Sequence, residues 1–241
     1  MKKLYEKSRL AFAIVWIVAY CVLMSIGDSL SESVGISKAV TLPIALTMSV
    51  TLLIFIKRNG LSNEYGLRKS KVPAGKMLFY LPLAILMSAN LIYGFKPNLS
   101  LAETALYILT MLCVGFLEEV IFRGLLFKSM AENGVKSAII VSSITFGIGH
   151  FVNLINGSGA KLLPNICQVV SAIAIGFLFV ALFHKTKSLW APIIAHAVIN
   201  SFSAFAVDIT NTQQIITSAV ISVIAVIYGM FILKNRGKVY E

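Results

Sequence analysis

The feature that most constrains the fold of this 241-residue sequence is a series of eight apolar runs, each about as long as a helix that crosses a bilayer. Because 58% of the residues are hydrophobic and 13% are charged, the chain has too few polar groups to cover a water-soluble surface. In hydrocarbon the backbone polar groups must be satisfied internally, so each run is predicted to be a helix. The runs are Leu10–Ile26, Ala39–Ile56, Met77–Tyr93, Glu103–Phe122, Ser137–Ile155, Pro164–Phe183, Leu189–Val207 and Gln214–Leu233.

These runs predict an all-α polytopic membrane protein, a bundle of about eight transmembrane helices in which residues 1–241 form a single membrane domain. A transmembrane β-barrel does not fit, because its strands alternate in polarity over segments of roughly 10 residues. The first run follows four basic residues and could be taken for a signal peptide. It has about 17 apolar residues where a signal peptide has 7–15, which favours an uncleaved span.

The distribution of basic residues predicts the orientation in the membrane. With the N-terminus in the cytoplasm, eighteen of the 21 Lys and Arg residues fall in cytoplasmic segments, and only Lys38, Lys96 and Lys161 fall outside. This bias predicts that both termini are cytoplasmic. The net charge of +11 therefore points to the bilayer and its anionic headgroups as the partner, and not to nucleic acid. The short loops suggest a bacterial plasma membrane.

The three cysteines, Cys21, Cys113 and Cys167, all lie inside apolar runs and have no CxxC spacing. They are interpreted as small buried residues and not as a disulfide or metal framework.

Ionisable residues inside the predicted spans are few, and each needs a physical reason because charge is costly in hydrocarbon. Glu119 and Arg123 are four residues apart on one helical face, which predicts an ion pair that stabilises the end of the helix. Glu118 lies about 100° around the same helix and needs another partner. The structural alternative is that both acids neutralise Arg123, although one arginine requires only one acid.

Two further spans carry a histidine with a second residue four positions away on the same face. Phe146 precedes His150 in the fifth run, and Asn200 follows His196 in the seventh. A single intramembrane histidine is usually a hydrogen-bonded packing residue. Two histidines, an unpaired glutamate and an asparagine at compatible depths instead predict a shared site, and small residues such as Gly115, Gly147, Gly149 and Ala195 would let the helices approach closely.

The glutamate pair with Arg123, the Phe146–His150 pair and the His196–Asn200 pair follow one another along the chain. In this order they resemble the three motifs of the CPBP (Abi) family of intramembrane proteases, over residues from about Glu103 to Ser201. That family includes CAAX-processing endopeptidases and bacterial members linked to bacteriocin processing and immunity. The motifs are Glu118-Glu119-x-x-x-Arg123, Phe146-x-x-x-His150 and His196-x-x-x-Asn200.

The resemblance implies an eight-helix bundle with an intramembrane cavity that opens to the cytoplasm and holds a reactive water. We expect Glu118 and His150 to activate this water, because a buried carboxylate or an imidazole can take its proton. His196 and Asn200 are expected to stabilise the oxyanion. Phe146, Glu119 and Arg123 are structural supports in this interpretation. The expected partner is a protein or peptide substrate at the membrane: a CAAX protein, a peptide pheromone or a bacteriocin precursor.

Three alternatives remain at this point. No cofactor is favoured, but zinc is the alternative, with Glu118, His150 and His196 as ligands and water in the fourth position. A proton-coupled transporter would use the same residues as a relay, although it predicts a broken helix or an internal repeat. A non-catalytic scaffold or immunity factor could also carry these motifs.

Overall fold

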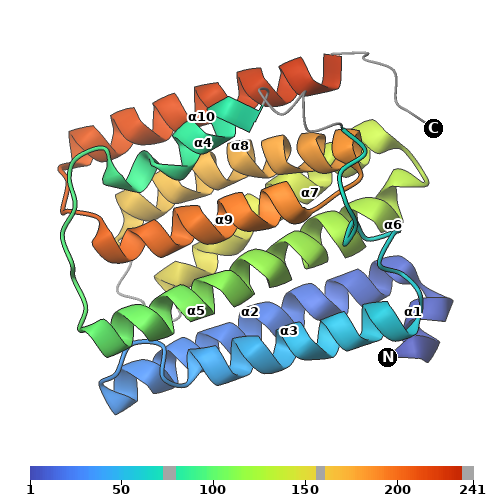
Figure 1. The fold of residues 1–241 in the computed structure, drawn as a ribbon, viewed down its shortest axis with the longest axis horizontal. Coiled ribbons are helices and arrows are strands. Elements are labelled where there is room, and N and C mark those ends of the chain that lie inside the picture. Colours follow the sequence, from blue (N-terminus) through green and yellow to red (C-terminus); the bar gives the residue numbers. More distant parts are fainter. Residues whose placement is uncertain (73–79, 156–160, 235–241) are drawn as a thin grey trace.

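A computed structural model describes residues 1–72, 80–155 and 161–234, which form a bundle of helices (Figure 1). These ranges contain no β-strand, so the predicted all-α class is confirmed. The α-helices are α1 (Lys2–Lys7), α2 (Arg9–Val34), α3 (Thr41–Arg58), α4 (Leu81–Met87), α5 (Leu101–Glu118), α6 (Lys128–Ala131), α7 (Val135–Gly149), α8 (Leu162–Thr186), α9 (Trp190–Phe202) and α10 (Asn211–Lys234). The 3-10 helices η2 (Ala89–Leu91), η4 (His150–Leu154) and η5 (Ser203–Phe205) and the π-helix η3 (Glu119–Phe127) follow α4, α7, α9 and α5, respectively.

Six helical runs within the described ranges are long and apolar enough to cross a membrane. They are Arg9–Val34, Thr41–Arg58, Leu101–Ala131, Val135–Leu154, Leu162–Thr186 and Asn211–Lys234. The polytopic membrane fold is thereby confirmed, while the count of eight stays a prediction because two of the expected spans are shorter. One is Trp190–Phe205. The other, expected at Met77–Tyr93, is helical over Leu81–Met87 and Ala89–Leu91, and its residues 77–79 lie outside the described ranges.

The end of α4 is tied into the bundle by a polar side chain. The Asn90 amide donates to the Ile199 carbonyl oxygen at 2.7 Å and to the Ser203 hydroxyl oxygen at 3.0 Å. These bonds hold the segment that follows α4 against the end of α9. The chain then leaves this segment through Gly94, which has a φ of 135°.

The helix ends follow ordinary local chemistry. Ser8 accepts a hydrogen bond from the Ala11 N–H at the start of α2, and Gly35 ends that helix in the left-handed conformation with a φ of 75°. Ser100 and Glu103 form a reciprocal capping box at the start of α5. These signals are present in the sequence and fix where the long helices begin and end.

The helices are arranged around two central ones (Figure 1). The α2–α3 hairpin lies on one side of the bundle, α10 and α4 lie on the other, and α5, α7, α8 and α9 lie between them. Within an apolar 18-residue stretch of each span, 56% of the residues are buried for Leu101–Ala131 and 61% for Leu162–Thr186, against 28–33% for the other four spans. Polar groups on these two central runs are therefore the ones that most need partners within the protein.

The outer helices present apolar side chains to their surroundings. Val18 on α2 and Ile227 on α10 are more than half exposed, and their apolar neighbours on the same helices are similarly exposed. Contiguous apolar surface of this extent is unfavourable in water and is solvated by lipid chains in a bilayer. The chain is accordingly an integral membrane protein.

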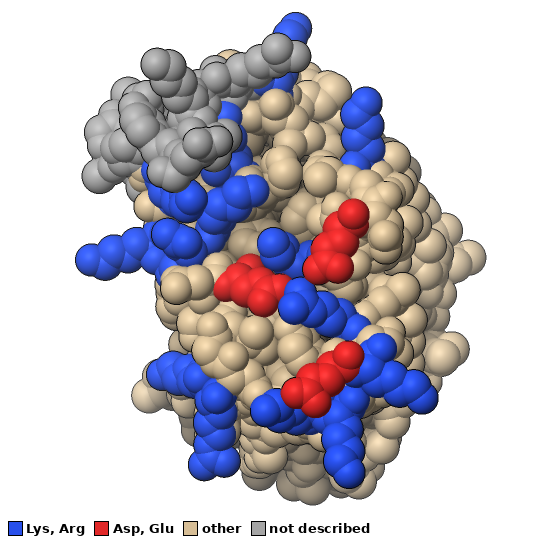
Figure 2. All heavy atoms as spheres, turned by 90° about the vertical axis from the view of Figure 1, so that its right-hand side faces the viewer, with Lys and Arg blue, Asp and Glu red and all other residues tan. Residues whose placement is uncertain are grey.

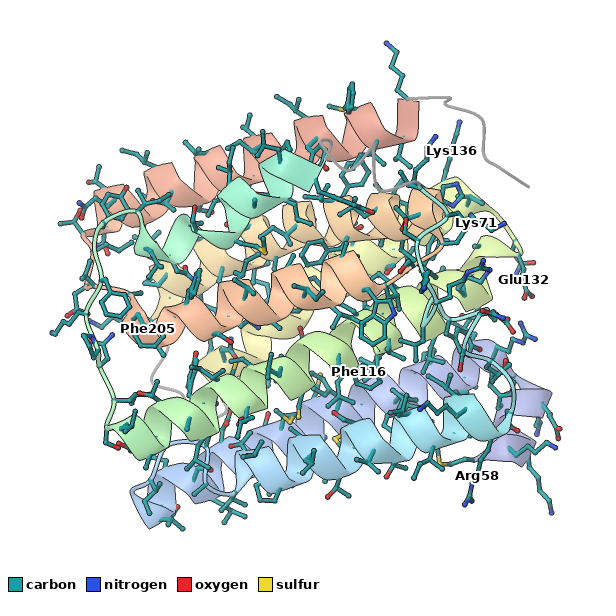
Figure 3. The ribbon with its side chains drawn as sticks, in the orientation of Figure 1. Arg58, Lys71, Phe116, Glu132, Lys136 and Phe205 are labelled. Carbon is teal, nitrogen blue, oxygen red and sulfur yellow. The ribbon has the colours of Figure 1, made fainter. Side chains whose placement is uncertain are left out.

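The two ends of the bundle differ in charge. We call the end formed by residues 2–9, 57–72, 128–136 and 185–189 the basic end; Figure 2 shows it with Lys and Arg side chains around a few acidic ones. The other end, formed by residues 35–40, 92–100, 150–155 and 203–210, is called the opposite end. In Figure 3, Arg58 and Lys71 lie at the basic end, whereas Phe205 lies at the opposite end.

One basic residue that was counted as a loop charge from the sequence does not lie in a loop. Arg123 was expected in a cytoplasmic segment, but it is fully buried in η3 and cannot act as a loop charge. Lys76, Arg236 and Lys238 were also counted there and lie outside the described residues. The remaining basic residues of the predicted cytoplasmic segments lie at or next to the basic end.

Candidate active site

The three motifs meet in the middle of the bundle although they are far apart in the sequence. Glu118 ends α5, His150 begins η4, and His196 lies in α9. The runs with His150 and His196 pack against α8, and α5 packs against α9. The motif side chains therefore converge on one region beside the central helices. The expectation that these residues share a depth and a site agrees with this arrangement.

Small residues make this convergence possible. A Cβ at Gly115 would lie 2.9 Å from the Ala197 nitrogen, and a Cβ at Gly147 would lie 2.8 Å from the Ile173 nitrogen. Both distances are too short, so α5–α9 and α7–α8 contacts require glycine at these positions. Gly149 was expected to serve the same purpose, and this expectation is wrong, because a Cβ there would meet no atom within 4 Å.

The predicted ion pair between Glu119 and Arg123 is confirmed. Arg123 Nη1 lies 3.0 Å from Glu119 Oε1, and both side chains have no exposed surface. The guanidinium also lies over the Phe146 ring at 4.0 Å and near the Phe179 ring at 5.6 Å. A buried arginine needs such compensation, and here one carboxylate and two aromatic faces supply it.

Glu118 has two contacts that the sequence did not identify. The Tyr20 hydroxyl donates to Glu118 Oε1 at 2.5 Å, and His196 Nε2 lies 3.3 Å from Glu118 Oε2. Neither contact is a fixed positive charge, so the Glu118 carboxyl is held in place without a permanent counter-ion. Its chemistry is therefore that of a positioned group that can accept a proton.

His196 lies between the two adjacent glutamates. Its Nδ1 is 2.8 Å from Glu119 Oε1, while its Nε2 faces Glu118. Glu119 was expected to serve Arg123 alone, but its Oε1 contacts both Arg123 and His196. The arrangement orients the imidazole, in the way that a carboxylate fixes a catalytic histidine ring.

Phe146 and His150 complete the wall of the site. The Phe146 ring makes edge contacts with the rings of His150 and His196, with centroids 5.4 Å and 5.6 Å apart. It also makes an edge contact with Phe122 at 5.3 Å. Phe146 therefore packs against the motif residues and also lines the cavity.

Two cavities of about 320 Å³ each meet at these residues. The apolar lobe, lined mainly by aliphatic and aromatic side chains of α4, α8, α9 and α10, reaches His196. The polar lobe lies between α2, α5 and α7 and reaches Glu118. The residues that line both lobes are Phe146, His150, Gln168, Asn200 and Ser203.

The boundary between the lobes is the place where a substrate could meet the motif residues. Glu118 faces one lobe, His196 faces the other, and His150 and Asn200 line both. A peptide lying across the boundary would have its backbone beside a carboxyl, two imidazoles and an amide. This is the set of groups that water activation and oxyanion stabilisation require.

The zinc alternative does not fit this geometry. Across the part of the chain that the structure describes, no three His, Cys, Asp or Glu side chains are placed to hold one metal ion. His196 has Nδ1 directed at Glu119 and Nε2 directed at Glu118. We derive no step through a metal, and independence from zinc stays a prediction to be measured.

Sequence reasoning missed Tyr20, Gln168 and Ser203, which belong to helices or positions outside the three motifs. A signal existed for Tyr20, because a tyrosine inside an apolar span usually has a partner for its hydroxyl. For Gln168 the signal was an amide near the start of the sixth run. Neither signal identifies its partner, since the partner depends on how helices distant in sequence pack.

Comparison with known proteins agrees with the motifs. Residues 100–202 match the family model described as type II CAAX prenyl endopeptidase Rce1-like. The Bacillus subtilis (strain 168) protein named "Putative membrane peptidase YdiL" is 33% identical over 87 residues, which cover 36% of this chain and 30% of that protein. This match thus spans less than a third of the relative's length. The matched family segment contains all seven motif residues, and the resemblance to the CPBP family of CAAX-type proteases is therefore confirmed over residues 100–202.

Proposed function

We propose that this chain is an intramembrane endopeptidase that hydrolyses a peptide bond of a membrane-associated protein or peptide, using water activated by Glu118 and His150. The observation that carries the proposal is the different setting of the two adjacent glutamates. Glu119 is fully buried against Arg123, whereas Glu118 has no arginine partner among the described residues and lines a cavity. If Glu118 only balanced charge, it would not need a position beside a cavity.

In the proposed reaction, Glu118 takes a proton from a water at the boundary of the lobes, with His150 orienting that water. The resulting hydroxide attacks the carbonyl carbon of the substrate, and the carbonyl oxygen becomes the oxyanion. Glu118 then returns the proton to the departing amine, so that the C–N bond breaks and the carboxyl group is restored to its starting state. This sequence uses a single carboxyl group as base and then as acid.

His196 and Asn200 are assigned to the oxyanion. The Asn200 amide is a donor in every protonation state. His196 has Nδ1 directed at Glu119, so in its neutral form Nδ1 carries the hydrogen and Nε2 does not. Donation from Nε2 to an oxyanion therefore requires the imidazolium.

The lobes suggest what kind of peptide fits. The apolar lobe is lined by side chains such as Leu86, Ile175 and Ile221, which suit an apolar residue next to the scissile bond. CAAX-type processing, peptide pheromone maturation and bacteriocin maturation or immunity all offer such substrates. We propose that the membrane is a bacterial plasma membrane, from the short loops, and that both termini are cytoplasmic, from the bias of basic residues.

The proposal is tested by comparing membrane proteomes. A strain lacking the gene is complemented with the parent chain or with Glu118→Ala at matched expression, and peptides ending at new termini are quantified. We expect a set of cleavage products that the parent restores and the variant does not. If Glu118→Ala restores the same products, the chain acts as a scaffold or a transporter and not as a protease.

A further inference from the structure

We propose that the substrate reaches the catalytic boundary from the opposite end of the bundle, which the distribution of charge places on the extracytoplasmic side of the membrane. The inference rests on the proposed protease function and names the side from which its substrate comes. Two sequence-based expectations, a cytoplasmic basic end and a cavity open to the cytoplasm, cannot both hold, because the cavity does not extend towards the basic end. The charge bias runs through every alternate loop, so we retain the first expectation and replace the second.

The lining of both lobes gives the direction of access. The apolar lobe is lined by the first half of α10, the later part of α9 and the connection between them, including Ala206 and Val207. These segments lie at the opposite end, where Figure 3 places the neighbouring Phe205. The polar lobe is lined by the later half of α2, by Lys38 in the loop that follows it, and by Asn153 at the end of η4. All of these positions lie in the half of the bundle away from the basic end.

The basic half of the bundle, in contrast, is filled by side chains. Between the motif residues and the basic end lie large residues of η3, α8 and the start of α9, each at most 3% exposed. They are Ile121, Leu125, Phe127, Phe183 and Leu189. Among the residues that the structure describes, packing of this kind leaves no path for a peptide from the basic end to Glu118.

Residues 65–71, which we call the strap, cover the basic end of the bundle. The Leu189 N–H donates to the Gly66 carbonyl oxygen at 2.9 Å, and the Lys71 N–H donates to the Thr186 carbonyl oxygen at 2.9 Å. The strap lies so close that a Cβ at Gly66 would collide with Phe183. The Tyr65 hydroxyl, which donates to that of Tyr5 at 2.9 Å, ties the strap to α1.

The strap explains a feature of the sequence that the motifs do not. Tyr65-Gly66-Leu67-Arg68 lies in the basic loop, and Gly66 has a φ of 71°, which favours glycine. The positive charge around the strap is dense. Burial, followed by repulsion from Lys128 and Lys71, lowers the pKa of the Lys187 ammonium. A strongly basic surface of this kind is typical of the cytoplasmic side of a membrane protein.

The mouth of the polar lobe carries charged and amide side chains. Lys38 and Asp28 form an ion pair at 2.7 Å, and the Asn153 amide donates to Gln168 Oε1 at 3.1 Å. Both pairs line the same lobe. The inferred substrate is therefore a membrane-attached peptide whose cleavage site is exposed at the outer surface, with an apolar residue for the apolar lobe and polar residues for this mouth.

The test is the accessibility of single cysteines in intact cells. Cys21, Cys113 and Cys167 are first replaced by alanine, and one cysteine is then introduced by Val207→Cys at the cavity or Lys71→Cys at the strap. The two positions are matched, because each is half-buried, lies outside a helix and lines a hollow. A membrane-impermeant maleimide is added before or after the cells are permeabilised, and the labelled fraction is measured by mass.

We expect Val207→Cys to be labelled in intact cells and Lys71→Cys to be labelled only after permeabilisation. The reverse pattern would overturn the inference by placing the cavity on the cytoplasmic side. Labelling of both positions only after permeabilisation, or no labelling of Val207→Cys under either condition, would overturn it as well. The measurement needs no catalysis and is repeated with Glu118→Gln present, so its failure is distinguishable from failure of the proposed protease function.

Discussion

The polar groups in the two halves of the bundle have opposite environments: they are fully buried in one half and line cavities in the other. In the basic half, Glu119 and Arg123 have no exposed surface, and the Arg123 guanidinium lies near the rings of Phe146 and Phe179. In the other half, Glu118, His150 and Asn200 line cavities. The boundary runs between adjacent residues of one helical run, since Glu118 ends α5 and Glu119 begins η3.

This difference separates groups that stabilise the fold from groups that are available for chemistry. A buried charge with a partner contributes to the structure and cannot easily change its protonation state. A carboxyl beside a cavity can exchange a proton with water or substrate. Loss of a residue from the basic half should therefore reduce the amount of folded protein, and loss of one from the cavity half should reduce the rate.

The largest expected effect on rate within the cavity half, apart from that of Glu118, concerns His150. We expect His150→Ala to lower kcat by about 10²–10⁴-fold, because a group that activates water by proton transfer contributes this much. Cleavage of a peptide in proteoliposomes measures the change. Phe151→Ala is the matched control, since Phe151 is the next residue of η4 and is 40% exposed. Equal rates for the two variants would remove His150 from the mechanism.

A smaller loss of rate is expected for the oxyanion residues. His196→Ala and Asn200→Ala should each lower kcat by about 10²–10³-fold with little change in KM. The double variant should lose much less than the product of the single losses, because residues that act together fail together. Ile194→Ala, a change on an exposed position of the same helix, serves as the control. A rise in KM alone would assign these residues to binding.

In the basic half, the expected effect is on stability. Arg123→Ala leaves the Glu119 carboxylate buried without its partner, which typically costs about 3–5 kcal/mol. Thermal unfolding in detergent and the yield of purified protein measure this loss. Arg58→Ala, which removes the same charge from the exposed end of α3, should change the free energy of unfolding by less than about 0.5 kcal/mol. Normal stability of Arg123→Ala would show that the pair is dispensable for folding.

The smallest expected effect is that of removing metal. Treatment of the purified enzyme with a chelator should leave its activity unchanged, with less than about 0.1 metal ion per chain by mass spectrometry. Activity that is lost to the chelator and restored by zinc would contradict the metal-free mechanism. Such a result would favour zinc held by Glu118, His150 and His196, the ligand set considered from the sequence.

The sequence predicted the parts of this comparison that depend on one helix at a time. The apolar runs, the Glu119–Arg123 pair and the three motifs all follow from spacing along a helix. It could not predict Tyr20 as the partner of Glu118, because that contact joins residues 98 positions apart. It also could not predict that Glu119 would hold His196, or that residues 119–127 would form a π-helix. These features depend on how the helices pack against one another.

The direction of the cavity shows the same limit. Charge in loops can be counted from the sequence, and it indicates which end of each span faces the cytoplasm. Which half of the bundle contains the cavity depends instead on which side chains fill the space between the helices. Phe183 and Leu189 fill space in the basic half. Both are apolar residues among other apolar residues, so the sequence does not distinguish them as the residues that close this half.

The most direct test of the division between the two halves is the cleavage rate of Glu118→Gln. This change keeps the shape of the side chain and removes the group that accepts the proton. Purified parent, Glu118→Gln and Glu132→Gln are reconstituted in proteoliposomes with the same peptide, and products are identified by mass spectrometry. Glu132→Gln is the matched control, because Glu132 is exposed at the basic end. We predict that Glu118→Gln is as abundant and heat-stable as the parent and forms no product, while Glu132→Gln cleaves normally. A Glu118→Gln enzyme that cleaves as fast as the parent would contradict the account.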